Sequence, residues 1–153
     1  MSEPTTQRIT LPSEADLAPL LGRNDENIRL LEAELALRIV ARGNQITLRG
    51  DERQVARGAR IVEELTARIA AGLPVQASDV RAALRVLAED DGADLKSIFL
   101  DAISVPSRKK QITPKTLTQK RYIEAIRAHD IVVGIGPAGT GKSYLAMAMA
   151  VSA

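Results

Sequence analysis

The chain has 153 residues, of which 45% are hydrophobic and 26% are charged, and its net charge is +2. This composition is typical of a globular protein with one ordinary domain or two small ones, and it excludes a disordered chain. The absence of cysteine excludes a disulfide scaffold and a thiolate metal site, and it fits a reducing cytosol. No N-terminal signal pattern and no apolar run long enough to span a membrane is present, so no membrane partner is expected.

The N-terminal part predicts a compact α+β module over residues 8–72. Residues 1–7 are polar and are expected to be disordered. Residues 8–11 alternate between polar and apolar side chains, which indicates a strand. Residues 13–16 form a capping-box pattern, so a short helix is expected to begin there and to end at Gly22.

The rest of this module predicts a helix, a hairpin and a second, longer helix. The first of these helices begins near Glu26. Two strands, residues 38–42 and 45–49, flank the two-residue turn Gly43-Asn44, which is typical of a tight β-hairpin. Apolar residues at helical spacing from Val55 to Ile69 predict the long helix. The predicted order is therefore β-α-α-β-β-α.

This order, with a glycine loop between its first two helices, resembles the KH-type fold that binds single-stranded nucleic acids. The stretch Leu20-Leu21-Gly22-Arg23-Asn24-Asp25-Glu26-Asn27-Ile28 lines up with the I-I-G-x-x-G-x-x-I pattern of that family. The resemblance implies that Gly22, Arg23 and Asn24 clamp the backbone of single-stranded RNA. Asp25 replaces the second glycine; its carboxylate would repel phosphate, and it is expected to cap the second helix instead. Two interpretations stay open: RNA binding, or a module that kept the topology without the contact.

Arginines of the same module offer a second route to phosphate binding. Arg23, Arg29, Arg38 and Arg42 are candidates for a phosphate-facing surface. Residues 8–71 contain ten arginines but also ten acidic residues, so solvated, salt-paired faces are an equally good interpretation.

Residues 73–105 predict a helical connector. One amphipathic helix carries Val80 and Leu87 on its apolar face, and a turn follows at Asp90-Asp91-Gly92. A second, short helix is expected to extend as far as Ile103.

A basic segment opens the last predicted domain, residues 106–153. It is expected to be an exposed linker or hairpin, and either a solvated loop or a nucleic-acid surface. Between residues 106 and 130, two acidic side chains accompany seven basic ones: Arg108, Lys109, Lys110, Lys115, Lys120, Arg121 and Arg127.

The strongest functional motif is Gly136-Pro137-Ala138-Gly139-Thr140-Gly141-Lys142-Ser143, which fits the phosphate-binding pattern G-x-x-x-x-G-K-[ST] at every position. Glycines let the backbone N–H groups point toward phosphates, and the helix that begins at the lysine adds its positive end. Lys142 is expected to contact the β- and γ-phosphates of ATP, and the Ser143 hydroxyl to bind Mg²⁺. The apolar run Ile131–Ile135 predicts the buried strand that precedes such a loop, and residues 142–153 predict the helix that follows it.

Gln119 and His129, which precede this loop in the sequence, also have expected roles. Gln119 lies near the start of a predicted helix, where proteins resembling superfamily 1 helicases place a glutamine that reads the adenine edge. Thr116-Leu117-Thr118-Gln119 also satisfies a capping box, so Gln119 equally well closes the helix start. His129, the only histidine, is expected to cap the end of this helix rather than to act in catalysis.

Together, these motifs resemble the N-terminal half of PhoH-like proteins over nearly all of residues 8–153. The resemblance implies a cytoplasmic bacterial ATP-binding protein with a helicase-like ATPase core and a role in RNA metabolism. It rests on the loop around Gly22, on Arg42-Gly43-Asn44, on Pro114 to Tyr122 and on Gly134 to Ala146.

The expected fold is thus a KH-like α+β module, a helical linker and the start of an α/β P-loop NTPase domain. Only ten residues follow Ser143, so the chain is expected to be part of a longer protein and to show no ATP turnover alone. A homo-oligomer would form through the complete NTPase domain. Two functions stay open: an ATPase that drives RNA handling, or an RNA-binding or interaction module in which the nucleotide is a conformational ligand.

Overall fold

A computed structural model describes residues 3–99, 101–105 and 110–153. The chain divides into two compact units, Met1–Leu95 and Lys96–Ala153. Each unit has its own sheet, and together they form an α+β structure. None of the helices in the described ranges is long and apolar enough to cross a membrane.

The first unit contains a three-stranded antiparallel sheet. Its strands are β1 (Thr5–Thr10), β2 (Arg38–Arg42) and β3 (Gln45–Gly50), and β3 lies in the centre, in the order β1-β3-β2. Ile46 and Leu48 of β3 are fully buried, while their neighbours Gln45, Thr47 and Arg49 point to the opposite face. Alternation of side chains thus gives the sheet one apolar face, which packs on helices, and one polar face.

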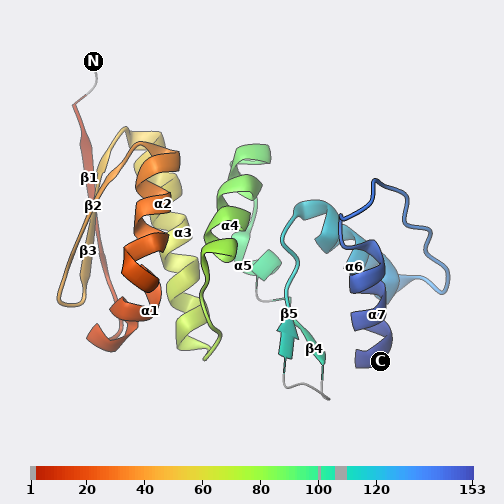
Figure 1. Ribbon diagram of the computed structural model, residues 1–153. Coiled ribbons are helices and arrows are strands. Elements are labelled where there is room, and N and C mark those ends of the chain that lie inside the picture. Colours follow the sequence, from red (N-terminus) through yellow and green to blue (C-terminus); the bar gives the residue numbers. More distant parts are fainter. Residues whose placement is uncertain (1–2, 100, 106–109) are drawn as a thin grey trace. The chain divides into compact units, whose positions relative to one another are not determined.

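The helices of this unit all lie on one side of the sheet (Figure 1). Two of the starts are capped by side chains that satisfy free backbone N–H groups. Ser13 caps the 3-10 turn Glu14–Asp16 by accepting a hydrogen bond from Ala15 N, and Asp51 caps the long helix α3 (Glu52–Ala70) by accepting from Arg53 N and Gln54 N. Their bounds are α1 (Leu17–Leu21), α2 (Glu26–Leu35), α3 (Glu52–Ala70) and α4 (Ala77–Glu89), with two 3-10 turns at Glu14–Asp16 and Arg23–Asp25. The core beneath them includes Leu11, Leu20, Leu31, Ile61, Val62 and Leu65.

The predicted β-α-α-β-β-α order is confirmed, but two predicted boundaries are wrong. Strand β1 begins at Thr5 rather than at residue 8, because Thr5, Thr6 and Gln7 pair with the end of β3. Helix α4, predicted as part of a separate connector, belongs to the first unit. An ion pair between buried Arg68 of α3 and buried Asp79 of α4, at 3.7 Å, joins the two helices.

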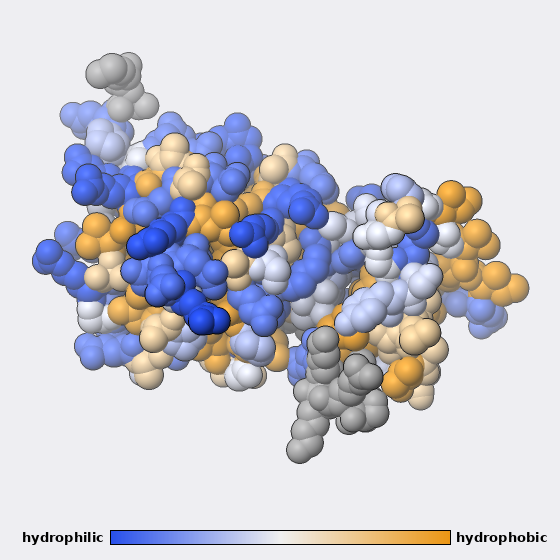
Figure 2. Space-filling view, in the orientation of Figure 1, coloured by the Kyte–Doolittle hydropathy of each residue, from blue (hydrophilic) through white to orange (hydrophobic). Residues whose placement is uncertain are grey.

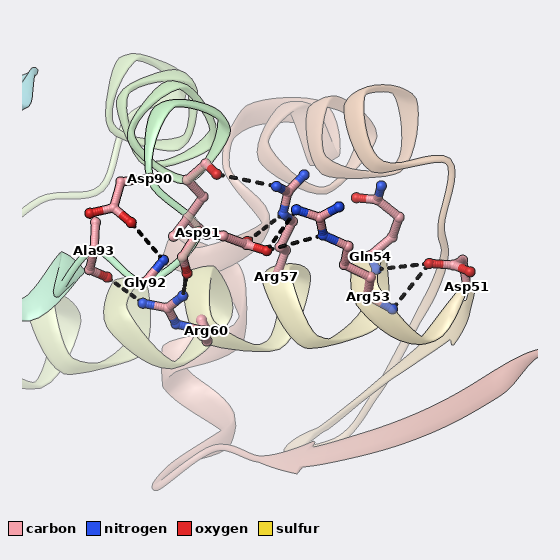
Figure 3. A network of polar contacts seen from close by, with 10 residues as sticks. Asp51, Arg53, Gln54, Arg57, Arg60, Asp90, Asp91, Gly92 and Ala93 are labelled. Atoms are coloured by element: carbon pink, nitrogen blue, oxygen red, sulfur yellow. Dashed lines mark hydrogen bonds and ion pairs between the residues drawn. The ribbon is translucent and has the colours of Figure 1, made fainter.

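Three arginines of α3 hold the loop that follows α4 (Figure 3). Arg53 and Arg57 both bind the carboxylate of Asp91, at 3.0 and 2.6 Å. Arg60 donates hydrogen bonds to the carbonyl oxygens of Asp91 and Ala93. The pKa of the Asp91 carboxyl is lowered below its usual value of 3.8, most strongly by the hydrogen bond from Arg57. Partial burial opposes this shift, and the hydrogen bond from Arg53 adds to it.

The second unit packs two helices against a short hairpin. Helix α5 (Leu95–Phe99) spans the boundary between the units, and β4 (Ile103–Val105) and β5 (Lys110–Ile112) pair antiparallel. Helices α6 (Leu117–Ala128) and α7 (Lys142–Ser152) follow. The core cluster is formed by Ile103, Ile123, Leu145 and Ala148.

Two predictions for this unit are wrong. The short helix ends at Phe99 and does not reach Ile103, because Ile103 pairs with Ile112 in the hairpin. The apolar run Ile131–Ile135 forms no strand: the structure describes all five residues, and none is paired in a sheet. A strand needs a neighbour to hydrogen bond, and an apolar pattern alone does not supply one. The hairpin expected for the basic segment is formed by β4 and β5, and the part of the segment between these strands, residues 106–109, lies outside the described ranges.

Candidate phosphate-binding loop

The glycine-rich loop of residues 136–141 leads directly into α7. Gly139 and Gly141 have positive φ angles of 78° and 87°, a backbone conformation that glycine adopts without steric cost. A Cβ atom at Gly139 would meet nothing within 4 Å. Gly139 and Gly141 thus serve the backbone geometry of the loop, and Lys142 is the first residue of the helix, as the sequence predicts.

The Lys142 side chain folds back over this loop. Its Nζ atom donates hydrogen bonds to the carbonyl oxygens of Gly136 and Pro137, both at 2.7 Å, and lies 3.2 Å from Thr140 Oγ1. The Thr140 hydroxyl in turn donates to Pro137 O at 3.0 Å. The lysine ammonium is therefore held inside the curve of the loop by groups that all belong to the loop.

Ser143 lies in the first turn of α7 and is exposed. The first turn of the helix is closed by a hydrogen bond from Leu145 N to the carbonyl oxygen of the N-cap residue Gly141, at 2.9 Å, and Leu145 itself is buried. Lys142 and Ser143 thus both lie at the N-terminus of a helix, and Ser143 is exposed to solvent.

Gln119 contacts the loop across 21 residues of sequence. Its Nε2 atom donates to Thr140 O at 3.1 Å, and its Oε1 atom accepts from Lys115 N at 2.7 Å. Thr116 caps α6 by accepting from Gln119 N at 3.0 Å, so the threonine half of the predicted capping box is confirmed. The glutamine half differs, because the Gln119 amide bonds Lys115 N rather than the backbone N–H of Thr116.

The segment between α6 and the loop has no regular secondary structure and is largely exposed. Ile131, Val133 and Ile135 are 85%, 78% and 94% exposed, and apolar residues gather at this edge of the second unit (Figure 2). His129 is the C-cap residue of α6, and its ring nitrogen lies 3.2 Å from Ala125 O, so its predicted capping role is confirmed.

The second candidate site, the loop Gly22-Arg23-Asn24-Asp25, has an unusual backbone. Asn24 and Asp25 both adopt left-handed conformations, with φ angles of 51° and 59°. Asp25 therefore has the geometry that a glycine at the same position would favour, and Asn and Asp are the non-glycine residues that tolerate it best. The prediction that Asp25 caps α2 is wrong, because its side chain makes no capping hydrogen bond.

The residue that supports this loop, Asn27, was missed by the sequence analysis. Asn27 is fully buried, and its Nδ2 atom donates to Leu20 O at 3.1 Å. A Cβ atom at Gly22 would lie only 2.8 Å from Asn27 Nδ2, so only glycine fits there. A polar residue on the apolar face of a predicted helix is the signal that would have identified Asn27.

Comparison with known proteins gives one family. Residues 111–153 match the family described as PhoH-like protein. The chain is 47% identical over 135 residues to the PhoH-like protein of Mycobacterium tuberculosis (strain ATCC 25618 / H37Rv), covering 88% of this chain and 38% of that relative. It is 35% identical over 147 residues to the PhoH-like protein of Bacillus subtilis (strain 168), covering 96% of this chain and 46% of that relative. The chain thus spans less than half the length of these relatives, and no solved structure matches it.

Proposed function

We propose that this chain, which is PhoH-like over most of its length, binds ATP through residues 136–143 and belongs to an ATPase of RNA metabolism in the bacterial cytoplasm. One observation carries the proposal. A complete phosphate-loop motif contains two glycines with positive φ angles and runs into the first turn of an eleven-residue helix, and the Lys142 ammonium lies inside the loop.

The residues present fit a nucleotide phosphate. Lys142 makes its hydrogen bonds to loop carbonyls and a threonine hydroxyl rather than to a carboxylate, so phosphate oxygens can replace these partners without breaking an ion pair. The backbone N–H groups at the start of α7 and the helix dipole favour negative charge at the same place.

A bound Mg²⁺ would neutralise phosphate charge, and Ser143 is the residue of this loop suited to hold it. Ser143 is an exposed residue in the first turn of α7. Lys142 would bind the β- and γ-phosphates, and the backbone of residues 136–141 would surround them. Gln119 lies beside the loop, and in this proposal its amide gives up its bond to Thr140 O and reads the adenine edge.

A second candidate function is supported by a different observation. The first unit has the β-α-α-β-β-α order and a left-handed loop at Gly22 to Asp25, as expected for a KH-like module that holds RNA. In this alternative, the nucleotide changes the conformation of an RNA-binding or interaction protein and is not its fuel.

Titration of the chain with ATP, ADP and adenosine, with and without Mg²⁺, tests the proposal. Binding should weaken as phosphates are removed, and Ser143→Ala should abolish most of the Mg²⁺ dependence while leaving metal-free binding unchanged. Equal affinity for adenosine and ATP would show that the loop does not bind phosphate.

A further inference from the structure

The polar face of the first sheet carries four arginines in a regular array. Three rows cross the three strands in register: Thr6, Arg49 and Arg38; Arg8, Thr47 and Val40; Thr10, Gln45 and Arg42. These side chains alternate with the buried ones, and most of them are exposed. None of the residues in the three rows is acidic.

These arginines have no partner that would explain their grouping. Across the described ranges, the side chains of Arg8, Arg38, Arg42 and Arg49 make no hydrogen bond or ion pair, whereas those of Arg53 and Arg57 in α3 share Asp91. Arg38 and Arg49 lie directly opposite each other on neighbouring strands, with Cα atoms about 5 Å apart, where like charges destabilise a sheet. The array therefore works against the stability of the unit in isolation.

The salt-paired interpretation of the module's balanced charge thus does not hold on this face. The helices α1, α2 and α3 all lie on the other side of the sheet, and no described element of the first unit covers the arginines (Figure 1). The residues Thr6, Arg8, Arg38, Val40, Arg42, Gln45, Thr47 and Arg49 line a shallow groove there. This groove is separate from the Gly22 loop, which belongs to the helical side of the unit.

We propose that this groove, the arginine groove, binds the phosphate backbone of single-stranded RNA. Arg38 and Arg42 lie about 13 Å apart along β2, and β3 and β1 add Arg49 and Arg8 beside them, so several successive phosphates are within reach of one face. Threonine and glutamine side chains between the arginines can hydrogen bond phosphate oxygens and the ribose 2′-hydroxyl. The groove has no aromatic residue, so bases are not stacked and binding is independent of sequence.

An acidic protein partner fits the groove less well. Acidic segments in protein interfaces pair with arginine around an apolar centre, and Val40 is the only apolar side chain that lines this groove. The inference does not depend on nucleotide binding at Lys142, since the arginine groove lies entirely in the first unit.

The test measures fluorescence anisotropy of a labelled single-stranded RNA of about 12 nucleotides with the whole chain at two salt concentrations. Arg38→Gln/Arg49→Gln is expected to weaken binding at least tenfold at low salt. It should also reduce the slope of log K against log salt by about 1.4, since each phosphate contact on a single strand contributes about 0.7. The matched control is Arg81→Gln/Arg85→Gln on α4, two exposed arginines that are expected to change affinity less than twofold.

Three results would overturn the inference. The first is an unchanged affinity and salt slope in Arg38→Gln/Arg49→Gln, with loss of binding instead in Arg23→Gln of the Gly22 loop. The second is tighter binding of polyglutamate than of RNA, which would assign the groove to an acidic protein. The third is equal affinity for single-stranded DNA of the same length, which would show that the groove makes no contact with the 2′-hydroxyl and does not select RNA. Thermal unfolding excludes a folding defect, because removal of the opposed arginines should leave the melting temperature unchanged or raise it.

Discussion

Gln119 connects the start of helix α6 to the glycine loop, with its Nε2 atom 3.1 Å from the carbonyl oxygen of Thr140. Its Oε1 atom accepts from Lys115 N at 2.7 Å, so both ends of the amide are bonded within the protein. The amide orientation follows from this network, with the oxygen toward Lys115 and the nitrogen toward the loop. Gln119 thus positions the loop in this structure, and any contact with adenine must replace the bond to Thr140.

Gln119→Ala is expected to lower nucleotide affinity. Loss of one hydrogen bond to the loop costs about 1 kcal/mol, or roughly a fivefold loss of affinity. If Gln119 acts only by positioning the loop, the substitution should weaken the binding of ATP and of GTP equally. If Gln119 also reads adenine, the binding of ATP should weaken more. Competition titrations with both nucleotides measure this, and an unchanged affinity for both would contradict either role.

Gly22→Ala is expected to destabilise the first unit more than Gly72→Ala. The two glycines have nearly equal φ angles, 76° and 74°, but Gly22 combines its positive φ with a ψ of −178°, a conformation that is essentially restricted to glycine. A Cβ atom at Gly22 would meet Asn27 at 2.8 Å, whereas one at Gly72 would meet nothing within 4 Å. Strain alone costs about 1 kcal/mol, and the clash should add about 1 to 3 kcal/mol at Gly22. Urea unfolding measures the free energy of unfolding of both variants. Equal losses of stability would show that Asn27 moves aside to make room for the added methyl group.

Asp25→Gly is expected to increase the free energy of unfolding by up to about 1 kcal/mol, because Asp25 has a left-handed backbone that glycine adopts without strain. Ala36→Gly is a matched control, since Ala36 is also left-handed, with a φ angle of 50°, and lies at the other end of α2. Both variants should be stabilised. Only Asp25→Gly should also strengthen RNA binding, provided that the Gly22 loop takes part in it. A loss of stability in both variants would show that these backbone angles are not strained.

Asp91→Asn is expected to destabilise the first unit at neutral pH and to change its acid sensitivity. The arginines lower the pKa of Asp91 below 3.8, so the carboxylate stabilises the fold fully at pH values above the unfolded-state pKa of about 4. That contribution is lost as the pH falls from about 4 through the lower pKa of the folded state. Urea unfolding at pH 7 and near pH 3 should therefore show a smaller difference between wild type and Asp91→Asn at the lower pH. A difference that is constant with pH would mean that the charge of Asp91 contributes nothing.

Much of the first unit could be predicted from sequence because its signals are local. Alternation located all three strands, the Gly43-Asn44 turn fixed the register of the hairpin, and helical spacing located α3. The capping of α2 by Asp25 was predicted wrongly because Asp suits both an N-cap and a left-handed position, and only the three-dimensional loop decides between them. The role of Asn27 depends on a contact with Leu20 across a turn, which no periodic pattern shows.

In the second unit, the sequence predicted the part determined by a fixed motif but not the part that depends on contacts between strands. The phosphate-loop motif located the start of α7 at Lys142, because a motif of fixed spacing determines local backbone geometry. The strand predicted for Ile131–Ile135 failed because strand formation depends on a pairing partner, and the described residues provide none. Only part of the arginine groove could be predicted from sequence. Arg38 and Arg42 were candidates for a phosphate-facing surface, but Arg8 and Arg49 are brought beside them only by strand pairing.

The central claim is that Lys142 binds the phosphates of ATP, and the affinity of Lys142→Ala for a fluorescent ATP analogue with Mg²⁺ tests it most directly. Loss of charge-assisted hydrogen bonds worth about 1.5 to 3 kcal/mol predicts a fall in affinity of roughly 10- to 150-fold. Arg121→Ala, which removes one exposed positive charge from α6, should leave affinity within twofold of wild type. An unchanged affinity in Lys142→Ala, or an equal loss in both variants, would contradict the account.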